Sequence, residues 1–297
     1  MSFAPRRIDH AVLASRNLSG QVELYRRLGF QVGARNRHPW GTENHIIQFD
    51  GSFLELISTG QGFRRPADGP PTRLSFPVFI HDYLQRREGF AMLALSSKDA
   101  PHDREVFAKA GVGDFETFHF ARRARRPDGS EAEVAFTLAF ARTKLLPGSG
   151  FFACEQHYPG NFWNPSFQEH PNGAIALESV IMIAENPSAH AEFLSHFTGQ
   201  REMRSTSLGL EIALADGQAL EVLTPQAFGF RYGDITPLTE TEGLAGLRIR
   251  VRNLDHARRT MLNEGIAAIE RDGMLVVSSE FGEGAAIVFT AGEPAAA

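Results

Sequence analysis

The stretch RIDHAVLASRNLSGQVELYRRLGF, residues 7–30, sets a pattern that the rest of the chain repeats. Its first part, residues 7–15, alternates apolar and polar side chains and predicts a β-strand. The second part predicts a helix, because Asn17 or Ser19 can cap it, apolar side chains recur at helical spacing, and Gly29 can end it. Three further strand-like runs follow, at residues 30–36, 43–49 and 53–58. The unit is therefore strand, helix and three strands.

The same order of elements returns three times along the chain. New units are expected to begin with strands at residues 89–97, 177–185 and 244–253, and the helices that follow them end at Gly111, Gly199 and Gly265. An internal repeat is the strongest fold signal in a sequence of this length. We predict an α+β fold of four βαβββ units, arranged as two paired-unit cupped mixed sheets with helices on the outside. The alternative is an α+β protein whose regularity is accidental.

A segment rich in Pro, Asn and Gly, residues 158–174, interrupts this repeat. It predicts a first domain at 1–160 that carries the site, a linker at 161–174, and a second half at 175–297. The segment also contains aromatic residues, namely Phe162, Trp163 and Phe167. These are expected to pack back onto one half or between the halves, either as a wrapped linker or as a lid across a pocket.

The composition limits the classes of partner and compartment. The net charge of −5 over 297 residues argues against nucleic acid as the main partner. No window approaches the roughly 18 unbroken apolar residues of a membrane span, and the first ten residues lack the apolar region of a signal peptide. The single cysteine, Cys154, is expected to be a small core residue and suits a reducing cytoplasm. We expect a cytoplasmic protein with a small-molecule partner and no membrane or nucleic-acid partner.

Glu55 lies in the middle of an apolar run, GSFLELIST at residues 51–59. A buried carboxylate must take up a proton, pair with another group or bind a metal, unless it faces water. His10, on the first strand of the same unit, is a candidate partner, because the first and last strands of a curled unit can point side chains into one concavity. A His and a Glu together suit a divalent metal such as Zn, Fe, Mn or Ni. A structural histidine is the alternative.

The second unit supplies further candidate ligands. Glu155 occupies the place of Glu55 in its last strand, and His157 lies two residues on, hence on the same face of the strand. Met92 stands where the first unit has His10, and a thioether is a poor ligand for a hard divalent metal. The predicted ligand set is therefore His10, Glu55, Glu155 and His157. Three of these four would leave an open position of the kind found in catalytic metal sites.

The second half offers fewer candidates. Glu221 echoes Glu55, but Ser179 stands at the place of His10. The half is expected to be structural, or to shape the pocket or a homodimer.

The loop RHPWGTENH, residues 37–45, carries polar and aromatic side chains that suit a substrate. Gly41 permits a sharp turn, and hydroxyl and amide groups near the mouth of the cup can donate and accept hydrogen bonds. The candidate substrate-binding residues are His38, Trp40, Thr42 and Asn44, together with Met92. The alternative is a turn that joins two strands, with Trp40 packed in the core.

A charged stretch, residues 121–133, predicts an exposed hairpin with opposite charges across a Pro-Asp-Gly turn. An anion site for a substrate carboxylate is the alternative.

The runs IDHAVLASRNLSGQVELYRRLGF, HPWGTENHIIQF and FLELI resemble the vicinal oxygen chelate (VOC) superfamily, and within it the glyoxalase-like domain family. The resemblance implies paired βαβββ units that cup a metal, which substrates chelate through two oxygen atoms. Activities in the superfamily include glyoxalase, extradiol dioxygenase, epimerase, and fosfomycin or bleomycin resistance. The metal positions of the family carry over to His10, Glu55 and Glu155, and the fourth falls on Met92, which departs from the family pattern.

Two functional hypotheses follow. The first is a metal-dependent lyase, isomerase or extradiol-type dioxygenase, in which Glu55, Glu155 or His157 serves as the base. The second is a metal-free small-molecule binding or resistance-type protein that uses the same apolar cup.

Overall fold

Two eight-stranded mixed sheets with the same strand order form the computed structural model, which describes residues 5–70, 72–125, 129–233 and 242–292. The first sheet has the order β2-β3-β4-β1-β5-β8-β7-β6, and the second the order β10-β11-β12-β9-β13-β16-β15-β14. In each, two central strands run antiparallel and each has a parallel neighbour from its own unit. The predicted architecture of four βαβββ units in two paired sheets is therefore confirmed.

The strands of the first sheet are β1 Ile8–Ala14, β2 Asn36–Arg37, β3 Thr42–Gln48, β4 Phe53–Thr59, β5 Gly89–Ser97, β6 Phe118–Arg125, β7 Glu131–Ala141 and β8 Gly150–Gln156. Those of the second are β9 Ala174–Ile183, β10 Arg204–Thr206, β11 Gly209–Ala213, β12 Ala219–Leu223, β13 Gly243–Val251, β14 Ile269–Arg271, β15 Met274–Val277 and β16 Ala286–Ala291. A strand was predicted at residues 30–36, but only Asn36 of that range is in a strand, the two-residue β2.

The helix that follows the first strand of each unit packs on the convex face of its sheet. These helices are α1 Leu18–Arg27, α3 Ala100–Lys109, α5 Ala191–Thr198, preceded by the 3₁₀ turn η2 Pro187–His190, and α7 Leu254–Asn263. Asn17 caps α1 by accepting a hydrogen bond from the Gly20 backbone. Apolar side chains of all four helices join one hydrophobic core with the convex faces of both sheets, which is where the outside helices were expected.

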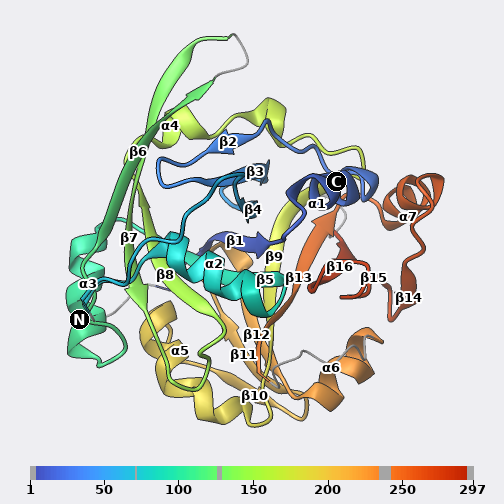
Figure 1. Cartoon of the computed structure of the whole chain (residues 1–297). Coiled ribbons are helices and arrows are strands. Elements are labelled where there is room, and N and C mark those ends of the chain that lie inside the picture. Colours follow the sequence, from blue (N-terminus) through green and yellow to red (C-terminus); the bar gives the residue numbers. More distant parts are fainter. Residues whose placement is uncertain (1–4, 71, 126–128, 234–241, 293–297) are drawn as a thin grey trace.

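Two further helices lie on the concave faces and were not predicted. They are α2 Phe76–Arg86 and α6 Pro225–Tyr232, and each connects the two units of one sheet. In Figure 1, α2 crosses in front of the first sheet near β1 and β5. Ile80 and Tyr83 of α2 pack against concave residues such as Val12 and Met92. The first cup is therefore partly filled, and only a small part of it stays open.

The two halves pack tightly against each other. Phe30 stacks on Phe289 of the second half, with ring centroids 5.9 Å apart. Gly89 has φ +112 and lies so close to Gly284 that a Cβ atom on Gly89 would be 2.4 Å from the Gly284 carbonyl oxygen. The predicted boundary falls between the two sheets, but the division into domains at 1–160 and 175–297 stays a prediction, because one core runs through both halves.

The linker wraps onto the first half, through α4 Pro159–Phe162 and the 3₁₀ turn η1 Pro165–Phe167. The Gln48 side chain donates to the Phe162 carbonyl (2.8 Å), and Trp163 packs edge-on against Phe53. A third 3₁₀ turn, η3 Ala215–Gly217, joins two strands of the second half.

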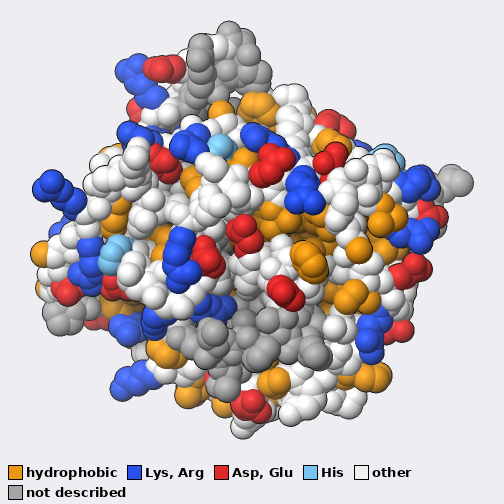
Figure 2. Space-filling model, turned by 45° about the vertical axis from the view of Figure 1, so that its right-hand side comes forward, with side chains coloured by type: hydrophobic (Ala, Val, Ile, Leu, Met, Phe, Trp, Pro, Cys, Tyr) orange, Lys and Arg blue, Asp and Glu red, His pale blue; other side chains and the backbone are white. Residues whose placement is uncertain are grey.

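The surface carries charges of both signs. Figure 2 shows Lys and Arg side chains intermixed with Asp and Glu on the face in view. Among the described residues, no helix is long and apolar enough to cross a membrane.

Candidate metal and substrate site

A β-bulge in β1 brings two neighbouring polar residues to the same face of the first sheet. Ile8 pairs with Leu95 and His10 with Ala94, so Asp9 is an extra residue in β1. Ile8 joins the convex core, whereas the Asp9 and His10 side chains touch each other on the concave side. In a regular strand, Asp9 and His10 would lie on opposite faces of the sheet, so the sequence did not reveal that Asp9 belongs to the site.

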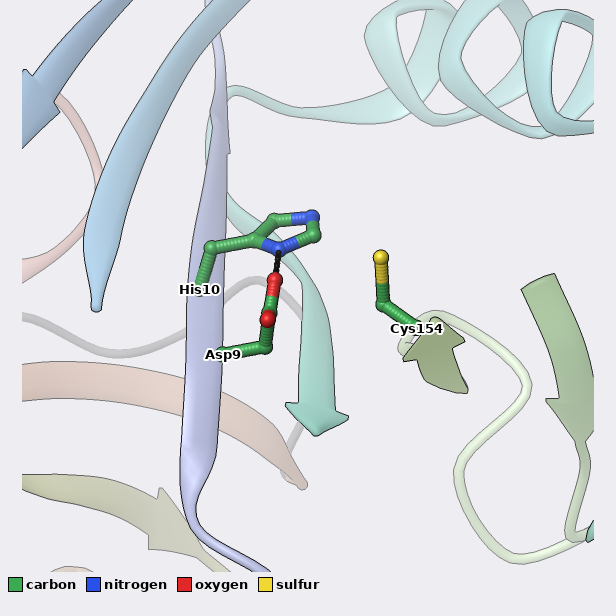
Figure 3. A group of neighbouring side chains, drawn as sticks. All are labelled: Asp9, His10 and Cys154. Atoms are coloured by element: carbon green, nitrogen blue, oxygen red, sulfur yellow. Dashed lines mark hydrogen bonds and ion pairs between the residues drawn. The ribbon is translucent and has the colours of Figure 1, made fainter. Parts of the chain in front are cut away.

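Asp9 is a buried carboxylate that orients His10 (Figure 3). Its Oδ1 lies 2.6 Å from His10 Nδ1, and its Oδ2 accepts a hydrogen bond from Gln156 Nε2 (2.8 Å). Cys154, on β8, also faces this pair, so that one donor atom from each of Asp9, His10 and Cys154 lies within 4.8 Å of the others. Because the carboxylate accepts a hydrogen bond at Nδ1, we assign the His10 proton to Nδ1 and a lone pair to Nε2.

Glu55 shares a cavity with His10, as predicted from the sequence. Phe53, Glu55 and Ile57 alternate onto the concave face of β4. One carboxylate oxygen of Glu55 lies 3.9 Å from His10 Nε2, and the other lies 4.0 Å from His38 Nε2. Asn44 Nδ2 donates to Glu55 at 2.5 Å. Among the described residues, Glu55 has no Lys or Arg nitrogen within ion-pair distance.

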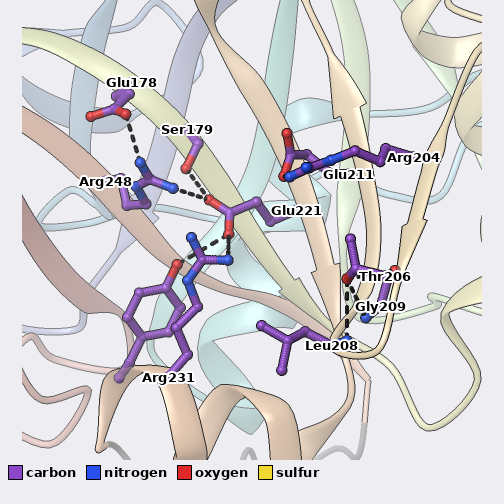
Figure 4. Close-up of polar contacts among 11 residues, drawn as sticks. Glu178, Ser179, Arg204, Thr206, Leu208, Gly209, Glu211, Glu221, Arg231 and Arg248 are labelled. Atoms are coloured by element: carbon purple, nitrogen blue, oxygen red, sulfur yellow. Dashed lines mark hydrogen bonds and ion pairs between the residues drawn. The ribbon is translucent and has the colours of Figure 1, made fainter. Parts of the chain in front are cut away.

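Glu221 on β12 provides an internal comparison, because it occupies the matching strand of the second sheet (Figure 4). Its carboxylate accepts hydrogen bonds from Ser179 (2.7 Å) and Tyr232 (3.1 Å) and pairs with Arg231 (3.0 Å) and Arg248 (2.8 Å). Two guanidinium groups therefore balance the charge of Glu221, whereas no cation of the described chain contacts Glu55. The roles predicted for the second half, as a structural half or in shaping the pocket or a homodimer, stay predictions.

His38 presents a hydrogen-bond donor to the cavity, in contrast to His10. Its Nδ1 lies 2.8 Å from Thr42 Oγ1, which also accepts the Trp40 indole N–H at 2.7 Å. The Thr42 hydroxyl proton is therefore directed to His38 Nδ1, and we assign the proton of neutral His38 to Nε2. Burial lowers the pKa of His38 to about 4, with Glu55 opposing and Arg122 assisting this shift, so the ring is neutral at pH 7.

The loop at residues 38–41 is a tight turn, as predicted. The Gly41 N–H donates to the His38 carbonyl (3.0 Å), and Gly41 has φ +97, which a side chain would disfavour. His38 and Trp40 stack with their ring planes 10° apart.

Aromatic side chains form most of the cavity wall. The cavity encloses about 460 Å³ between atoms, its mouth included, and its polar lining comprises His10, His38, Asn44, Glu55, Arg122 and Cys154. The aromatic lining comprises Trp40, Phe53, Phe76, Phe120, Phe136, Phe152 and Phe162. Phe162 shows that the linker contributes to this wall. The aromatic wall favours a flat or apolar body, and the polar lining favours a few polar atoms on it.

Arg122 reaches the cavity from β6, in the stretch predicted to be an exposed hairpin or an anion site. Its guanidinium donates to Asn36 Oδ1 (3.1 Å), and Asn36 donates to Asn44 (3.1 Å), which donates to Glu55. The neighbouring Arg123 pairs with Glu131 across the hairpin (3.0 Å), as the exposed alternative expects. The Pro-Asp-Gly turn of this hairpin begins at residues 127–128, which lie outside the described residues.

The structure separates Glu155 and His157 from the cavity. Phe152 and Cys154 face the concave side of β8, so Glu155 faces the convex side with Phe151 and Ala153. There it accepts a hydrogen bond from the Ala100 backbone at the start of α3 (2.9 Å).

His157 lies on the same convex side, 3.6 Å from Glu155, and its Nε2 contacts Thr137 Oγ1 at 2.7 Å. The predicted metal and catalytic roles of Glu155 and His157 require a shared cavity with His10, which the structure does not provide. A one-residue offset explains the difference, because it moves a side chain to the other face of a strand.

Two of the predicted substrate residues do not line the cavity. Thr42 is fully buried and acts only through His38 and Trp40. Met92 packs against Gly150 and lines a different cavity. Cys154 was predicted to be a core residue, and it is buried but also lines the site. Burial raises the pKa of the Cys154 thiol well above its ordinary value, with Asp9 and Glu55 adding to the effect.

Comparisons with known proteins agree with this fold. The glyoxalase-like domain family matches residues 8–198. No curated protein matches the chain. A hypothetical protein from Staphylococcus aureus is similar in structure, with a TM-score of 0.64 and 12% identity over 96% of this chain and 99% of that one.

Two other solved structures share the fold. A triple mutant of 4-hydroxymandelate synthase from Streptomyces coelicolor has a TM-score of 0.58 and 14% identity, over 99% of this chain and 94% of that one. A xylose isomerase-like TIM barrel/4-hydroxyphenylpyruvate dioxygenase fusion protein has a TM-score of 0.59 and 12% identity. The alignment with the fusion protein covers 100% of this chain and 51% of that one.

Proposed function

The chain belongs to the glyoxalase-like domain family, and on that premise we propose that it is a divalent-metal-dependent enzyme. Its substrate is a small molecule with an apolar, preferably aromatic, body and two adjacent oxygen atoms. The reaction belongs to the lyase, isomerase or extradiol-type dioxygenase classes. The protein acts in the cytoplasm, where its single cysteine stays a buried free thiol.

The contrast between Glu55 and Glu221 carries this proposal. Both are nearly fully buried carboxylates on matching strands, and burying such a charge without a partner is costly. Glu221 has two arginines, whereas Glu55 has an amide donor and two imidazoles. The Arg122 guanidinium shares the cavity and its charge acts on Glu55, but it makes no ion pair with the carboxylate. A bound cation would supply the direct partner that Glu55 lacks.

The donors around the cavity fit such a cation. His10 Nε2 carries a lone pair, and Asp9 stands behind the ring as carboxylates commonly do behind metal-binding histidines. Glu55 and His10 would hold the metal, and Cys154 is a further donor on the same wall. Imidazole, carboxylate and thiolate together suit Zn or Fe better than Mn. When bound, the metal would act as a Lewis acid on the two substrate oxygens.

The other cavity residues would bind and orient the substrate. His38 Nε2–H donates a hydrogen bond to a substrate oxygen, and Arg122 attracts negative charge that develops there. Glu55 accepts a proton from the substrate carbon or hydroxyl group that lies beside it. The aromatic wall holds the body of the substrate and excludes water.

Metal content tests the proposal directly. We would purify the chain without a metal-affinity tag, reconstitute it with Zn, Fe(II), Mn or Ni, and measure the bound metal by elemental mass spectrometry. Near-stoichiometric metal in the parent, lost in His10→Ala and Glu55→Gln, is the expected result. Glu155→Gln and His157→Ala are matched controls from the opposite face of the sheet, and both should keep the metal.

Absence of metal from the parent under all four conditions would overturn the enzyme proposal. The aromatic wall would then favour the second candidate, a metal-free protein that binds an apolar small molecule in the same cavity.

A further inference from the structure

A second cavity opens at the other end of the first sheet, where β5, β7 and β8 meet the start of α2. It encloses about 1130 Å³ between atoms, its mouth included, compared with about 460 Å³ for the first cavity. The two cavities share no lining residue. The second is therefore a separate space, large enough for a ligand of ordinary size.

The floor of this second cavity is apolar. It is formed by the partly exposed side chains of Phe79, on α2, and Phe115, in the segment between α3 and β6, which lie over the buried Met92 of β5 and Phe140 of β7. Met92 is 1% exposed and packs against Gly150, so this part of the floor is held firmly by the core. The exposed parts of Phe79 and Phe115 favour a hydrocarbon or aromatic group, because covering them removes apolar surface from water.

The rim of the cavity is basic. Arg73, Arg86 and Arg142 lie around it, together with the carboxylates of Asp68 and Asp82.

Both of these carboxylates are already paired. Arg65, which does not line the cavity, donates to Asp82 through Nε and Nη2 (2.8 Å each) and to Asp68 through Nη2 (2.8 Å). Its guanidinium holds the pKa of Asp82 down, to about 2, with His81 assisting. The acids are therefore engaged away from the rim arginines.

Two rim guanidinium groups remain unengaged. In the part of the chain that the structure describes, the side chains of Arg73 and Arg142 have no hydrogen-bond or ion-pair partner. Arg142 extends from the end of β7, and Arg73 lies on the loop before α2. Guanidinium groups bind carboxylate and phosphate groups through paired hydrogen bonds, which gives both charge and geometric preference.

We propose that this cavity is a second ligand site, which takes a small organic anion: a carboxylate or phosphate group carried on an apolar body. The anionic group lies between Arg73 and Arg142, and the apolar body covers the partly exposed rings of Phe79 and Phe115. Neutral ligands would lose the charge interaction, and cationic ligands would be repelled. The inference does not rest on the proposed metal-dependent activity, since it uses neither His10 nor Glu55.

Decanoate is a suitable probe, and decanol is its matched neutral control with the same chain length. We would measure binding of both to the full chain by isothermal titration calorimetry at low salt. Decanoate is expected to bind more tightly than decanol, and its binding is expected to weaken as salt is raised, because screening reduces the attraction of exposed charges.

Variants then locate the site. The double variant Arg73→Gln/Arg142→Gln is expected to bind decanoate at least tenfold more weakly and to leave decanol binding unchanged. Arg123→Gln removes one positive charge from an exposed hairpin far from the rim and serves as the charge control, with no expected effect. Val78→Trp fills the cavity from α2 and is expected to abolish binding of both probes, with circular dichroism as the check on folding.

Three results would overturn the inference: no decanoate binding by the parent, equal affinity for decanoate and decanol, or full affinity in the double variant. If the double variant keeps full affinity, loss of decanoate binding in His38→Ala would place the probe in the first cavity. None of these results depends on whether the first cavity holds a metal.

Discussion

Asp9→Asn tests whether metal binding needs the orientation that Asp9 gives His10, because the His10 ring itself is kept. The change keeps the size of the side chain and removes only its charge and one acceptor. In the parent, Asp9 accepts hydrogen bonds from His10 Nδ1 (2.6 Å) and Gln156 Nε2 (2.8 Å). A carboxamide can accept one of these and must turn its own N–H₂ group toward the other.

The size of the effect follows from these contacts. If the amide group donates to His10 Nδ1, the ring moves its proton to Nε2 and loses the lone pair that faces Glu55. Loss of such a supporting carboxylate lowers metal affinity by roughly 10–100-fold, or about 1.4–2.8 kcal/mol. Hydrogen bonds to a charged group contribute about 1.5–3 kcal/mol each to folding stability. We therefore expect metal affinity and stability to fall by similar amounts.

The assay is competition for Zn against a chromophoric chelator, beside urea unfolding of the same samples. Glu221→Gln is the matched control, because it also removes a buried, hydrogen-bonded carboxylate but lies in the second cup. It is expected to lose stability and to keep the parent's metal affinity. The reasoning is refuted if Asp9→Asn binds Zn as tightly as the parent, or if Glu221→Gln weakens Zn binding as much as Asp9→Asn does.

The remaining predictions concern the neighbouring groups and the core. Thr42→Val removes the hydroxyl that fixes the His38 proton, so ¹⁵N NMR should show part of the proton on Nδ1; an unchanged spectrum would contradict the assignment. Since burial lowers the pKa of His38 to about 4, protonation favours the unfolded chain, and stability should fall as the pH drops from about 6.5 to about 4, by at most about 3 kcal/mol. In His38→Gln, the free energy of unfolding measured by urea titration should depend less on pH. An unaltered pH dependence would contradict the assignment of this loss to His38. Because its pKa is raised, the Cys154 thiol should resist Ellman's reagent at pH 8 in the folded chain and react in urea; rapid labelling of the folded chain would show that the thiol is accessible. Phe289→Ala should lower the free energy of unfolding by about 3–5 kcal/mol. Trp fluorescence reports on the first half alone, and its unfolding transition should still coincide with the transition seen by circular dichroism. Separate transitions would mean that the halves unfold independently.

The sequence by itself determined the repeated order of a strand, a helix and three strands, and hence the fold, although it did not indicate α2 and α6. Alternating strands, a helical segment and a terminating glycine recur four times, and each of these signals is local, so the sequence alone reveals it. The pair of His10 and Glu55 could also be predicted, because both lie on strands of one unit with an otherwise apolar face. The turn at Gly41 was predictable because a positive φ has a strong residue preference.

The faces of the strands were decided only in the tertiary structure. The bulge at Asp9 changes the alternation of β1, and a one-residue offset in β8 points Cys154 rather than Glu155 into the cup. Each depends on how a strand pairs with its neighbours, and a shift of one residue reverses every side chain beyond it. The sequence therefore indicated the right strands, and His10 and Glu55 on them, but not the part of Asp9 and Cys154 in the site.

The contents of the cups were also decided by long-range packing. The helices α2 and α6 cover the concave faces, and Phe162 of the linker completes the wall of the first cavity. Glu55 and Glu221 look alike in sequence, since each lies in an apolar strand with the same neighbours in kind. Only the approach of Arg231 and Arg248, which lie 10 and 27 residues further along the chain, gives the Glu221 carboxylate its cationic partners. Charge compensation is a property of the folded site, and it is what leaves Glu55 available for a cation.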